Sequence, residues 1–393
     1  MKVLRKVLAV LAIILAAGAV TIIIVERGRS TSVMGEEVSA DESAYTASIV
    51  ASAIDSVNYP EGEHPPYRRD VHAKAHGCVR ATVEVDPQVP VAYRAGVFSQ
   101  PGRQYLSWIR FSNGSPGNPL GDGERDARGM ALKLTGVAGA KLLEGEQDAE
   151  TQDFIMVNSP VFFIRNVADY AKFARVLADD GGMALGYFLG GANPLGWHLR
   201  DAYLALGTKR KAPASLLHEQ YHSWSAYKLG DLNIKFSARS CTKQPVATVD
   251  RRQPSFLRAE LKAELNSGEG CFDLLVQPQV AGKNMPVEDT TVRWKESDSA
   301  FVKVATVHVP KQEFDTERQN EFCESLSFTP WHTLPEHRPL GGINRIRRAV
   351  YQEVARYRRA KMIDNSGKPY LAKTEPKGWC LDLSGATCEA TKP

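Results

Sequence analysis

The pattern of apolar and polar positions predicts strands first and long helices later. The second half of the stretch 68–85 alternates apolar and polar residues and is rich in valine, which predicts a strand. Further strand regions are predicted at 105–112, 130–134, 152–165, 271–277 and 301–309. Helices are expected between or after these runs, without regular strand–helix alternation. This order is typical of the α+β class, an antiparallel sheet or barrel with helices packed outside.

Three helices stand out from their periodicity and their ends. Asn166 can cap a helix whose first turn carries Asp169, and residues 254–267 predict a helix that stops at Gly268. The longest is 341–358, where apolar residues recur three or four positions apart. These apolar positions are Ile343, Ile346, Val350 and Val354.

The N-terminal segment has a different composition. An uncharged, mostly apolar run from 7 to 25 follows Lys2, Arg5 and Lys6, and its length suffices to cross a bilayer as a helix. No small-x-small cleavage site follows it, so we favour an uncleaved signal anchor over a cleaved signal peptide. The positive flank puts the N-terminus in the cytoplasm and the body on the extracytoplasmic side. The predicted location is therefore the cell membrane, with a single pass.

Charge and cysteine content narrow the function classes. The net charge of +4 over 393 residues, without a dense basic block, argues against nucleic-acid binding. No C-x-x-C pair occurs, which argues against a zinc ribbon or an iron–sulfur centre. An extracytoplasmic body permits disulfides. Cys380 and Cys388 form a possible local pair, but the sequence does not fix the connectivity.

Two patterns carry candidate chemistry. Arg347 lies four residues before Tyr351, so on a helix the guanidinium and the phenol share one face. A tyrosine has a pKa of about 10, and an adjacent arginine favours its phenolate form, a hard ligand suited to ferric iron. His218-Glu219-Gln220-Tyr221-His222 fits the H-E-x-x-H zinc signature. No third ligand stands out downstream, so zinc is the weaker alternative.

Four motifs occur in a fixed order along the chain. They are Val71-His72-Ala73-Lys74, then Arg110-Phe111-Ser112 with Arg125-Asp126-x-Arg128-Gly129, then Asn158-Ser159-Pro160-Val161-Phe162-Phe163-Ile164-Arg165, then Arg347-x-x-x-Tyr351. This ordered set resembles the haem-dependent catalase family over residues 65–360. The resemblance implies an eight-stranded antiparallel barrel with haem b, an iron porphyrin, at its side. The domain prediction is a membrane segment 1–29, a flexible tether 30–45, a catalase-like haem domain 46–362 and a C-terminal tail 363–393.

The resemblance also assigns roles to single residues. Tyr351 would be the axial iron ligand, and Arg347 would hold it as phenolate. His72 would be the general acid/base and Asn158 would orient the peroxide. The remaining positions that match haem-binding residues are Arg69, Val71, Arg110, Phe163, Tyr170 and Arg358, of which the three arginines match propionate-binding positions.

Departures from the family pattern define the alternatives. The chain after the proximal helix is short, no NADPH site can be assigned, and the loop 112–124 is rewritten. His76 and Cys78 stand where catalases have small residues, and residues 336–344 are closer to the short catalase-related proteins. Val71 replaces a threonine that allene oxide synthase places before its histidine, which favours hydrogen peroxide as the substrate.

The predicted function is haem-dependent decomposition of hydrogen peroxide. One alternative is a haem peroxidase, or an isomerase or lyase of fatty-acid hydroperoxides, for which a membrane anchor would be apt. Another is a non-catalytic haem-binding protein. The oligomeric state is not predicted.

Overall fold

The computed structural model describes residues 13, 16–21, 24–25, 34–57, 69–115, 121–179 and 184–361. Most of the predicted membrane segment, the tail 363–393 and the cysteines at 380 and 388 lie outside these residues. Within the described part, no helix has the length and apolar character needed to cross a membrane.

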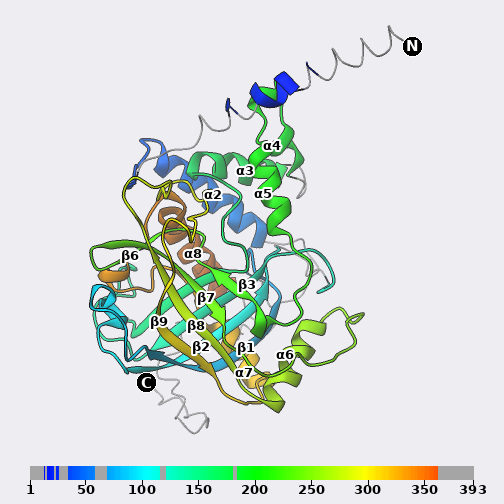
Figure 1. Cartoon of the computed structure of the whole chain (residues 1–393). Coiled ribbons are helices and arrows are strands. Elements are labelled where there is room, and N and C mark those ends of the chain that lie inside the picture. The colour runs from blue at the N-terminus through cyan, green and yellow to red at the C-terminus, as the bar shows by residue number, and fades with distance from the viewer. Residues whose placement is uncertain are drawn as a thin grey trace.

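A closed antiparallel barrel forms the centre of the molecule (Figure 1). Its strands are β1 (Ala75–Val85), β2 (Gln104–Asn113), β3 (Arg128–Thr135), β4 (Thr151–Val157), β5 (Gln220–His222), β7 (Leu232–Ser240), β8 (Gly270–Pro278) and β9 (Val302–Val309). Strand β5 pairs with both β4 and β7, which closes the ring of eight strands, while the short β6 (Tyr227–Leu229) forms a hairpin with β7. The predicted eight-stranded antiparallel barrel is confirmed.

Apolar side chains fill the barrel. Along β1, the alternate residues Val79, Ala81, Val83 and Val85 are at most 1% exposed and belong to the main hydrophobic core. Strand β4 ends at Val157, earlier than the predicted range 152–165. The backbone of Phe162 instead hydrogen-bonds to Thr290, so the chain leaves the sheet after Val157.

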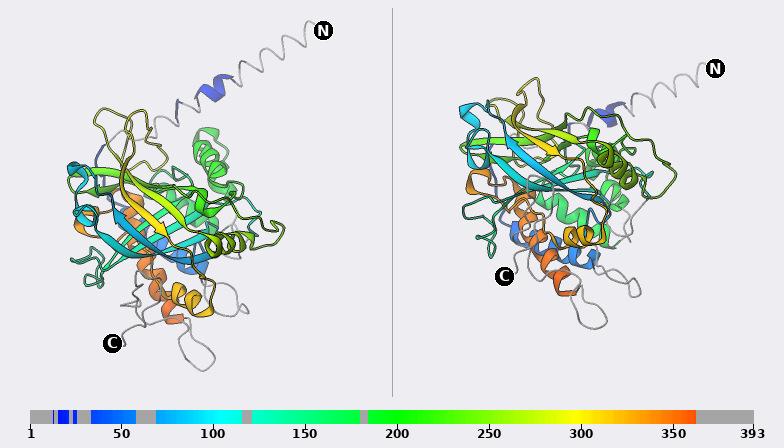
Figure 2. Two further views of the ribbon diagram at one scale, coloured as in Figure 1. Left: turned by 60° about the horizontal axis from the view of Figure 1, so that its bottom comes forward. Right: turned by 90° about the horizontal axis from the view of Figure 1, so that it is seen from below.

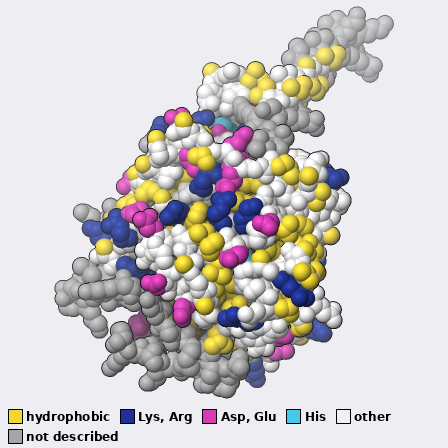
Figure 3. Space-filling view, turned by 90° about the vertical axis from the view of Figure 1, so that its left-hand side faces the viewer, with side chains coloured by type: hydrophobic (Ala, Val, Ile, Leu, Met, Phe, Trp, Pro, Cys, Tyr) yellow, Lys and Arg dark blue, Asp and Glu magenta, His cyan; other side chains and the backbone are white. Residues whose placement is uncertain are grey.

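Helices pack outside the barrel. They are α2 (Glu42–Val57), α3 (Val167–Asp179), α4 (Leu185–Leu189), α5 (Leu199–Thr208), α6 (Phe256–Ser267), α7 (Glu317–Ser325) and α8 (Gly342–Lys361), with short 3₁₀ turns at Val91–Tyr93, Gly96–Phe98, Pro194–Gly196, Leu216–His218 and Pro335–His337. Helix α2 packs against α3 and α8. Figure 2 shows α2, α7 and α8 on one side of the barrel. The face in Figure 3 carries basic, acidic and apolar side chains side by side, so neither positive nor negative charge dominates it.

Residues 34–45 do not run free of the body. Helix α2 begins at Glu42, and Arg345 of α8 pairs with Glu36 at 2.9 Å and with Glu42 at 2.6 Å. The described residues of the range predicted as a flexible tether are thus tied to α8. The other domain boundaries remain predictions.

The H-E-x-x-H motif lacks the helical geometry that a zinc site would require. His218 ends a 3₁₀ turn, and Gln220–His222 is strand β5. His218 Nε2 lies 3.1 Å from the Gln244 carbonyl oxygen. The two histidines therefore do not share a helix face, and the zinc alternative loses its structural basis.

Two disulfides cross-link the described part of the chain. Cys78 of β1 bonds to Cys323 of α7, and Cys241, just after β7, bonds to Cys271 of β8. Disulfides persist in oxidising compartments. They support the extracytoplasmic location, whereas the membrane anchor remains a prediction.

A buried charged cluster joins the barrel to the segment that leads into α8. Lys133 of β3 and Asp153 of β4 form an ion pair at 2.8 Å. His332 lies 2.9 Å from Asp153 and 2.7 Å from Glu146. Burial and Lys133 lower the pKa of His332, but the two carboxylates outweigh them and raise it to about 9.

This cluster predicts a pH dependence of stability. The folded pKa of His332 is above its ordinary value of 6.5, so its stabilising contribution is full below pH 6.5 and is lost as the pH rises through 9. We expect wild type to exceed His332→Gln by up to about 3 kcal/mol in the free energy of unfolding at pH 6, with a smaller difference at pH 10. Denaturant titrations at both pH values measure it. A difference independent of pH would contradict the assignment. The pKa of Lys235 is lowered to about 7 by burial, so its effect on stability changes with pH in the opposite direction. This effect is the same in wild type and variant and cancels in the difference between them.

Candidate active site

An open cavity lies between the barrel wall and helices α7 and α8. Its walls come from the segment before β1, from β2, β3 and β4, from residues 324–328 and from α8. Much of the lining is apolar, including Met130, Ile155, Phe328 and Val354. The cavity brings together six of the ten predicted site residues: Arg69, Val71, His72, Arg110, Tyr351 and Arg358.

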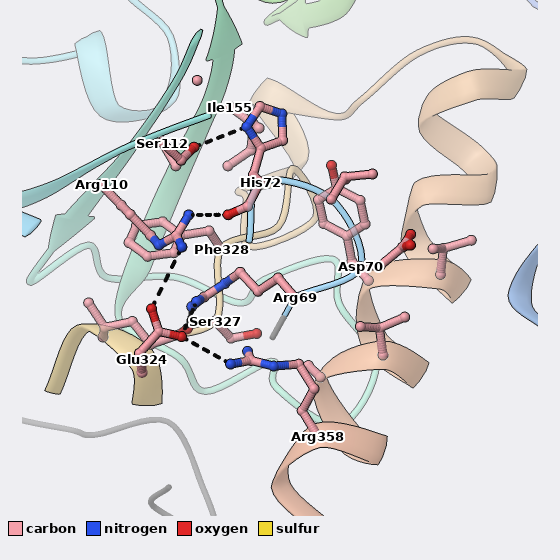
Figure 4. A pocket seen from close by; sticks show the side chains of 18 of the residues that line it. Arg69, Asp70, His72, Arg110, Ser112, Ile155, Glu324, Ser327, Phe328 and Arg358 are labelled. Carbon is pink, nitrogen blue, oxygen red and sulfur yellow. Dashed lines mark hydrogen bonds and ion pairs between the residues drawn. The ribbon is translucent and has the colours of Figure 1, made fainter. Parts of the chain in front are cut away.

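His72 is held in an unusual backbone conformation. Its φ of 59° lies in the left-handed region, which non-glycine residues rarely adopt and which is enriched at functional sites. Arg110 fixes this turn by donating to the carbonyl oxygens of His72 and Ala73, at 2.9 and 3.2 Å. The imidazole Nδ1 lies 3.0 Å from Ser112 Oγ. Figure 4 marks this contact with a dashed line. His72, which lines the cavity, is therefore held both at its backbone and at Nδ1 of its side chain.

The charge state of His72 suits a proton acceptor. Burial, and secondarily the cation of Arg110, lower the pKa of His72 to about 4. The imidazole is therefore neutral at neutral pH. Ser112 Oγ can accept the Nδ1 proton, and Nε2 is then the basic nitrogen.

Gly129 makes room for this imidazole. A Cβ at this position would lie 2.6 Å from His72 Nδ1 and 2.8 Å from Ser112 Oγ. We therefore expect Gly129→Ala to displace the ring and to lower peroxide turnover by at least about tenfold, because general acid–base catalysis depends on position. Steady-state assays measure the effect. Gly123→Ala is the control, since its Cβ would meet nothing within 4 Å. Unchanged turnover in Gly129→Ala would show that the ring position is not critical.

The predicted pairing of Arg347 with Tyr351 is present on α8. Arg347 donates to the Tyr351 hydroxyl oxygen from Nε at 3.2 Å and from a terminal nitrogen at 3.1 Å. Its other terminal nitrogen donates to Asn344 at 3.0 Å. Burial lowers the pKa of Arg347, but the phenol groups of Tyr351 and Tyr227 raise it above its ordinary value. A permanent cation thus faces the oxygen that would bind iron.

Three arginines converge on one carboxylate at the cavity wall (Figure 4). Glu324 of α7 lies 2.8 Å from Arg69, 3.6 Å from Arg110 and 3.1 Å from Arg358. Burial raises the pKa of Glu324, but the three cations outweigh it and hold it at about 2. Burial and neighbouring Arg69 lower the pKa values of Arg110 and Arg358 to about 9.

This donor set fits haem. Three cations against one carboxylate leave an excess of two positive charges, which matches the two propionates of the porphyrin. Arg110 Nε is also buried without a hydrogen-bond partner, so the group retains a donor for an anion. The apolar lining suits the porphyrin faces, and Tyr351 would supply an oxygen ligand to the iron.

Four predicted residues do not line the cavity. Asn158 accepts from the backbone N–H of Arg128 at 2.8 Å and donates to Glu219 at 3.0 Å. Phe163 and Tyr170 pack in an aromatic cluster with Phe162, Phe173 and Trp224, and Arg347 lies behind Tyr351. Burial and the charge of Asp70 raise the pKa of Tyr170. The roles assigned to these four residues remain predictions.

Sequence reasoning missed several functional candidates. Glu324 has no local signal, because the arginines that surround it come from three separate segments of the chain. Asp70 lines the cavity and has a pKa raised by burial. Ser112 and Gly129 belong to the motifs that resemble the catalase family, and their positions in these motifs could have indicated a role at the site.

Comparison with known proteins supports the family resemblance. Residues 51–182 match the catalase family model, a range that includes His72, Arg110 and Asn158 but not Tyr351. A catalase-related peroxidase of Mycolicibacterium paratuberculosis is 29% identical over 68% of this chain and 81% of its own length. Catalase T of Saccharomyces cerevisiae is 25% identical over 69% of this chain, which spans only half of that protein.

Solved structures show the same fold. A fungal catalase superposes with a TM-score of 0.58 at 16% identity, covering 85% of this chain and 77% of that one. Catalase A from Saccharomyces cerevisiae gives a TM-score of 0.58 at 15% identity, covering 85% and 80%. These structures show that the chain has the catalase fold, and the family model and the curated relatives support the resemblance that the motifs indicate.

Proposed function

We propose that the cavity binds haem b, with Tyr351 as the axial iron ligand, and that the loaded protein decomposes hydrogen peroxide. The observation that carries this proposal is that His72 and the Arg347-paired Tyr351 line the same apolar-walled cavity. Arg69, Arg110 and Arg358 would bind the propionates. Two disulfides and the apolar run 7–25 support an extracytoplasmic body anchored in the membrane.

The chain's own residues would manage the proton. When bound, ferric haem supplies the redox chemistry that cleaves the peroxide O–O bond. His72 Nε2 would accept a proton from one peroxide oxygen and return it to the other, while Nδ1 donates to Ser112 Oγ and fixes the tautomer. The neutral form of His72 is available at neutral pH because burial lowers its pKa to about 4.

A peroxidase is the second candidate. In this structure the Asn158 amide is engaged by Arg128 and Glu219, so a peroxide in the cavity would lack its predicted second contact. The relative from Mycolicibacterium paratuberculosis is named as a peroxidase, which favours this candidate. Rates with hydrogen peroxide alone, with an added electron donor and with a fatty-acid hydroperoxide separate the candidates. Absence of turnover under all three conditions would contradict both.

Optical spectroscopy of the purified full-length chain loaded with haem tests the ligand. We expect a ferric phenolate spectrum that is lost or altered in Tyr351→Phe, because phenylalanine offers no oxygen to the iron. Tyr357→Phe is the matched control, since Tyr357 lies on the same helix and does not line the cavity. A wild-type protein that takes up no haem, or a Tyr351→Phe spectrum identical to wild type, would overturn the proposal.

A further inference from the structure

Three potential metal ligands converge away from the cavity, where α3 meets the segment that contains α4 and α5. Asp169 lies in the first turn of α3, His198 precedes α5, and Asp201 lies in its first turn. One ligand atom from each residue lies within 4.8 Å of the others. Among the described residues, this is the one cluster of three His, Cys, Asp or Glu side chains whose ligand atoms lie close enough to hold a metal ion.

The buried carboxylate of Asp201 is incompletely satisfied. Its side chain is 0% exposed, and Oδ1 has no hydrogen-bond partner. Oδ2 lies 3.3 Å from His198 Nδ1, a buried nitrogen that also lacks a hydrogen bond. An unsatisfied oxygen of a buried carboxylate is costly, and buried charges in proteins are paired or coordinate metals. A cation bound by both this carboxylate and this imidazole would give His198 Nδ1 a partner and would balance the buried charge of Asp201.

Tyr187 of α4 fixes the geometry of two of the ligands. Its hydroxyl donates to Asp201 Oδ2 at 2.6 Å. Its ring stacks on the His198 imidazole, with centroids 4.3 Å apart and planes 20° apart. Supporting contacts of this kind orient the ligands in metal sites. The arrangement is therefore built before any cation binds.

The neighbouring cations leave Asp169 available. Arg165 lies 3.9 Å and Lys172 lies 3.7 Å from its carboxylate, both beyond ordinary hydrogen-bond length. Arg165 also lies 3.7 Å from Asp289, and the Lys172 side chain is 64% exposed. Lys172 can therefore turn into solvent when a divalent cation approaches, at a cost below about 1 kcal/mol.

We propose that Asp169, His198 and Asp201 bind one divalent transition-metal cation, Zn²⁺ or Mn²⁺. One imidazole and two carboxylates suit these ions better than Mg²⁺ or Ca²⁺, which prefer oxygen ligands alone. Metal–ligand bonds of about 2.0–2.1 Å in a tetrahedral site separate ligand atoms by roughly 3.3 Å. The observed separation of 3.3 Å between His198 Nδ1 and Asp201 Oδ2 fits this value.

The cation would link the segment that contains α4 and α5 to helix α3. Figure 1 shows α4 and α5 projecting beyond α3, and Leu185, Tyr203 and Leu206 of these helices are 64–76% exposed. These exposed apolar side chains contribute little packing stability to α5. Metal binding that joins α5 to α3 supplies folding free energy directly. The site is independent of haem.

Calorimetric titration of the chelator-treated full-length chain with ZnCl₂ and with MnCl₂ tests the proposal. We expect wild type to bind one equivalent of at least one of these ions. Asp201→Asn and His198→Gln should abolish binding, and Tyr187→Phe should weaken it by about 10- to 100-fold. In wild type alone, the bound ion should slow amide hydrogen exchange over residues 185–208.

The controls separate this site from other metal binding. His218→Gln removes a histidine of the H-E-x-x-H motif, and Asp250→Asn removes an exposed carboxylate, so both should bind as wild type does. Circular dichroism verifies that each variant is folded. Loss of binding in His218→Gln, equal binding in wild type and in the folded Asp201→Asn or His198→Gln, or absence of binding of both ions would overturn the proposal.

Discussion

Replacing His72 by alanine is expected to slow peroxide consumption by about a hundred- to ten-thousand-fold, the range typical of a positioned acid/base group. Haem should remain bound, because the alanine leaves Tyr351 and the arginines of the cavity in place. The rate of hydrogen peroxide loss and the optical spectrum, measured on the same sample, check both parts of this expectation.

The control and the pH profile make this result specific. His308 is an exposed histidine on β9, so His308→Ala should retain full activity. In wild type the rate should be steady near neutral pH and fall only as the pH approaches 4, where His72 becomes protonated. Equal rates in His72→Ala and wild type would support the non-catalytic haem-binding alternative. A haem-free His72→Ala protein would instead assign His72 a structural role.

Replacing Glu324 by glutamine is expected to lower the free energy of unfolding of the haem-free protein by about 3 kcal/mol. Removal of one partner from a buried ion pair costs about 3–5 kcal/mol. The low end applies here because the Glu324 side chain is 28% exposed. The arginine side chains left without this carboxylate are only 4–15% exposed. Denaturant unfolding of wild type and variant measures the loss.

Haem should then reverse part of this effect. The propionates would supply the negative charge that Glu324→Gln lacks, so haem should stabilise the variant more than it stabilises wild type. Glu353→Gln is the matched control, because Glu353 pairs with Arg356 on the surface and such pairs contribute less than about 1 kcal/mol. Equal stabilisation of wild type and Glu324→Gln by haem would show that the propionates do not bind at these arginines.

Local patterns predicted local structure well. Valine-rich alternation predicted β1, the apolar period predicted α8, and Asn166 does accept a hydrogen bond from the backbone N–H of Asp169 at the start of α3. The Arg347–Tyr351 contact followed from helical spacing alone. Each of these features depends on residues close together in the sequence, where periodicity and capping act.

Contacts between segments that are far apart in the sequence could not be predicted from local patterns. The closure of the barrel between β5 and β7 involves a three-residue strand with no periodicity of its own. The pairing of Cys78 with Cys323 bridges 245 positions, and six cysteines allow many connectivities. The motifs placed Asn158 at the site, but Arg128 and Glu219 bind its side chain. That competition is visible only once the strands are paired.

The Cys78–Cys323 disulfide makes the position of one cavity wall depend on whether the chain is oxidised. It joins the strand that follows His72 to the helix that carries Glu324, across 245 positions. Closing so long a loop disfavours the unfolded chain by about 5 kcal/mol in the chain-entropy account. A newly made chain in a reducing compartment would lack this constraint beside its arginines. Oxidation to form this disulfide therefore favours the arrangement in which the helix that carries Glu324 lies beside the strand that follows His72.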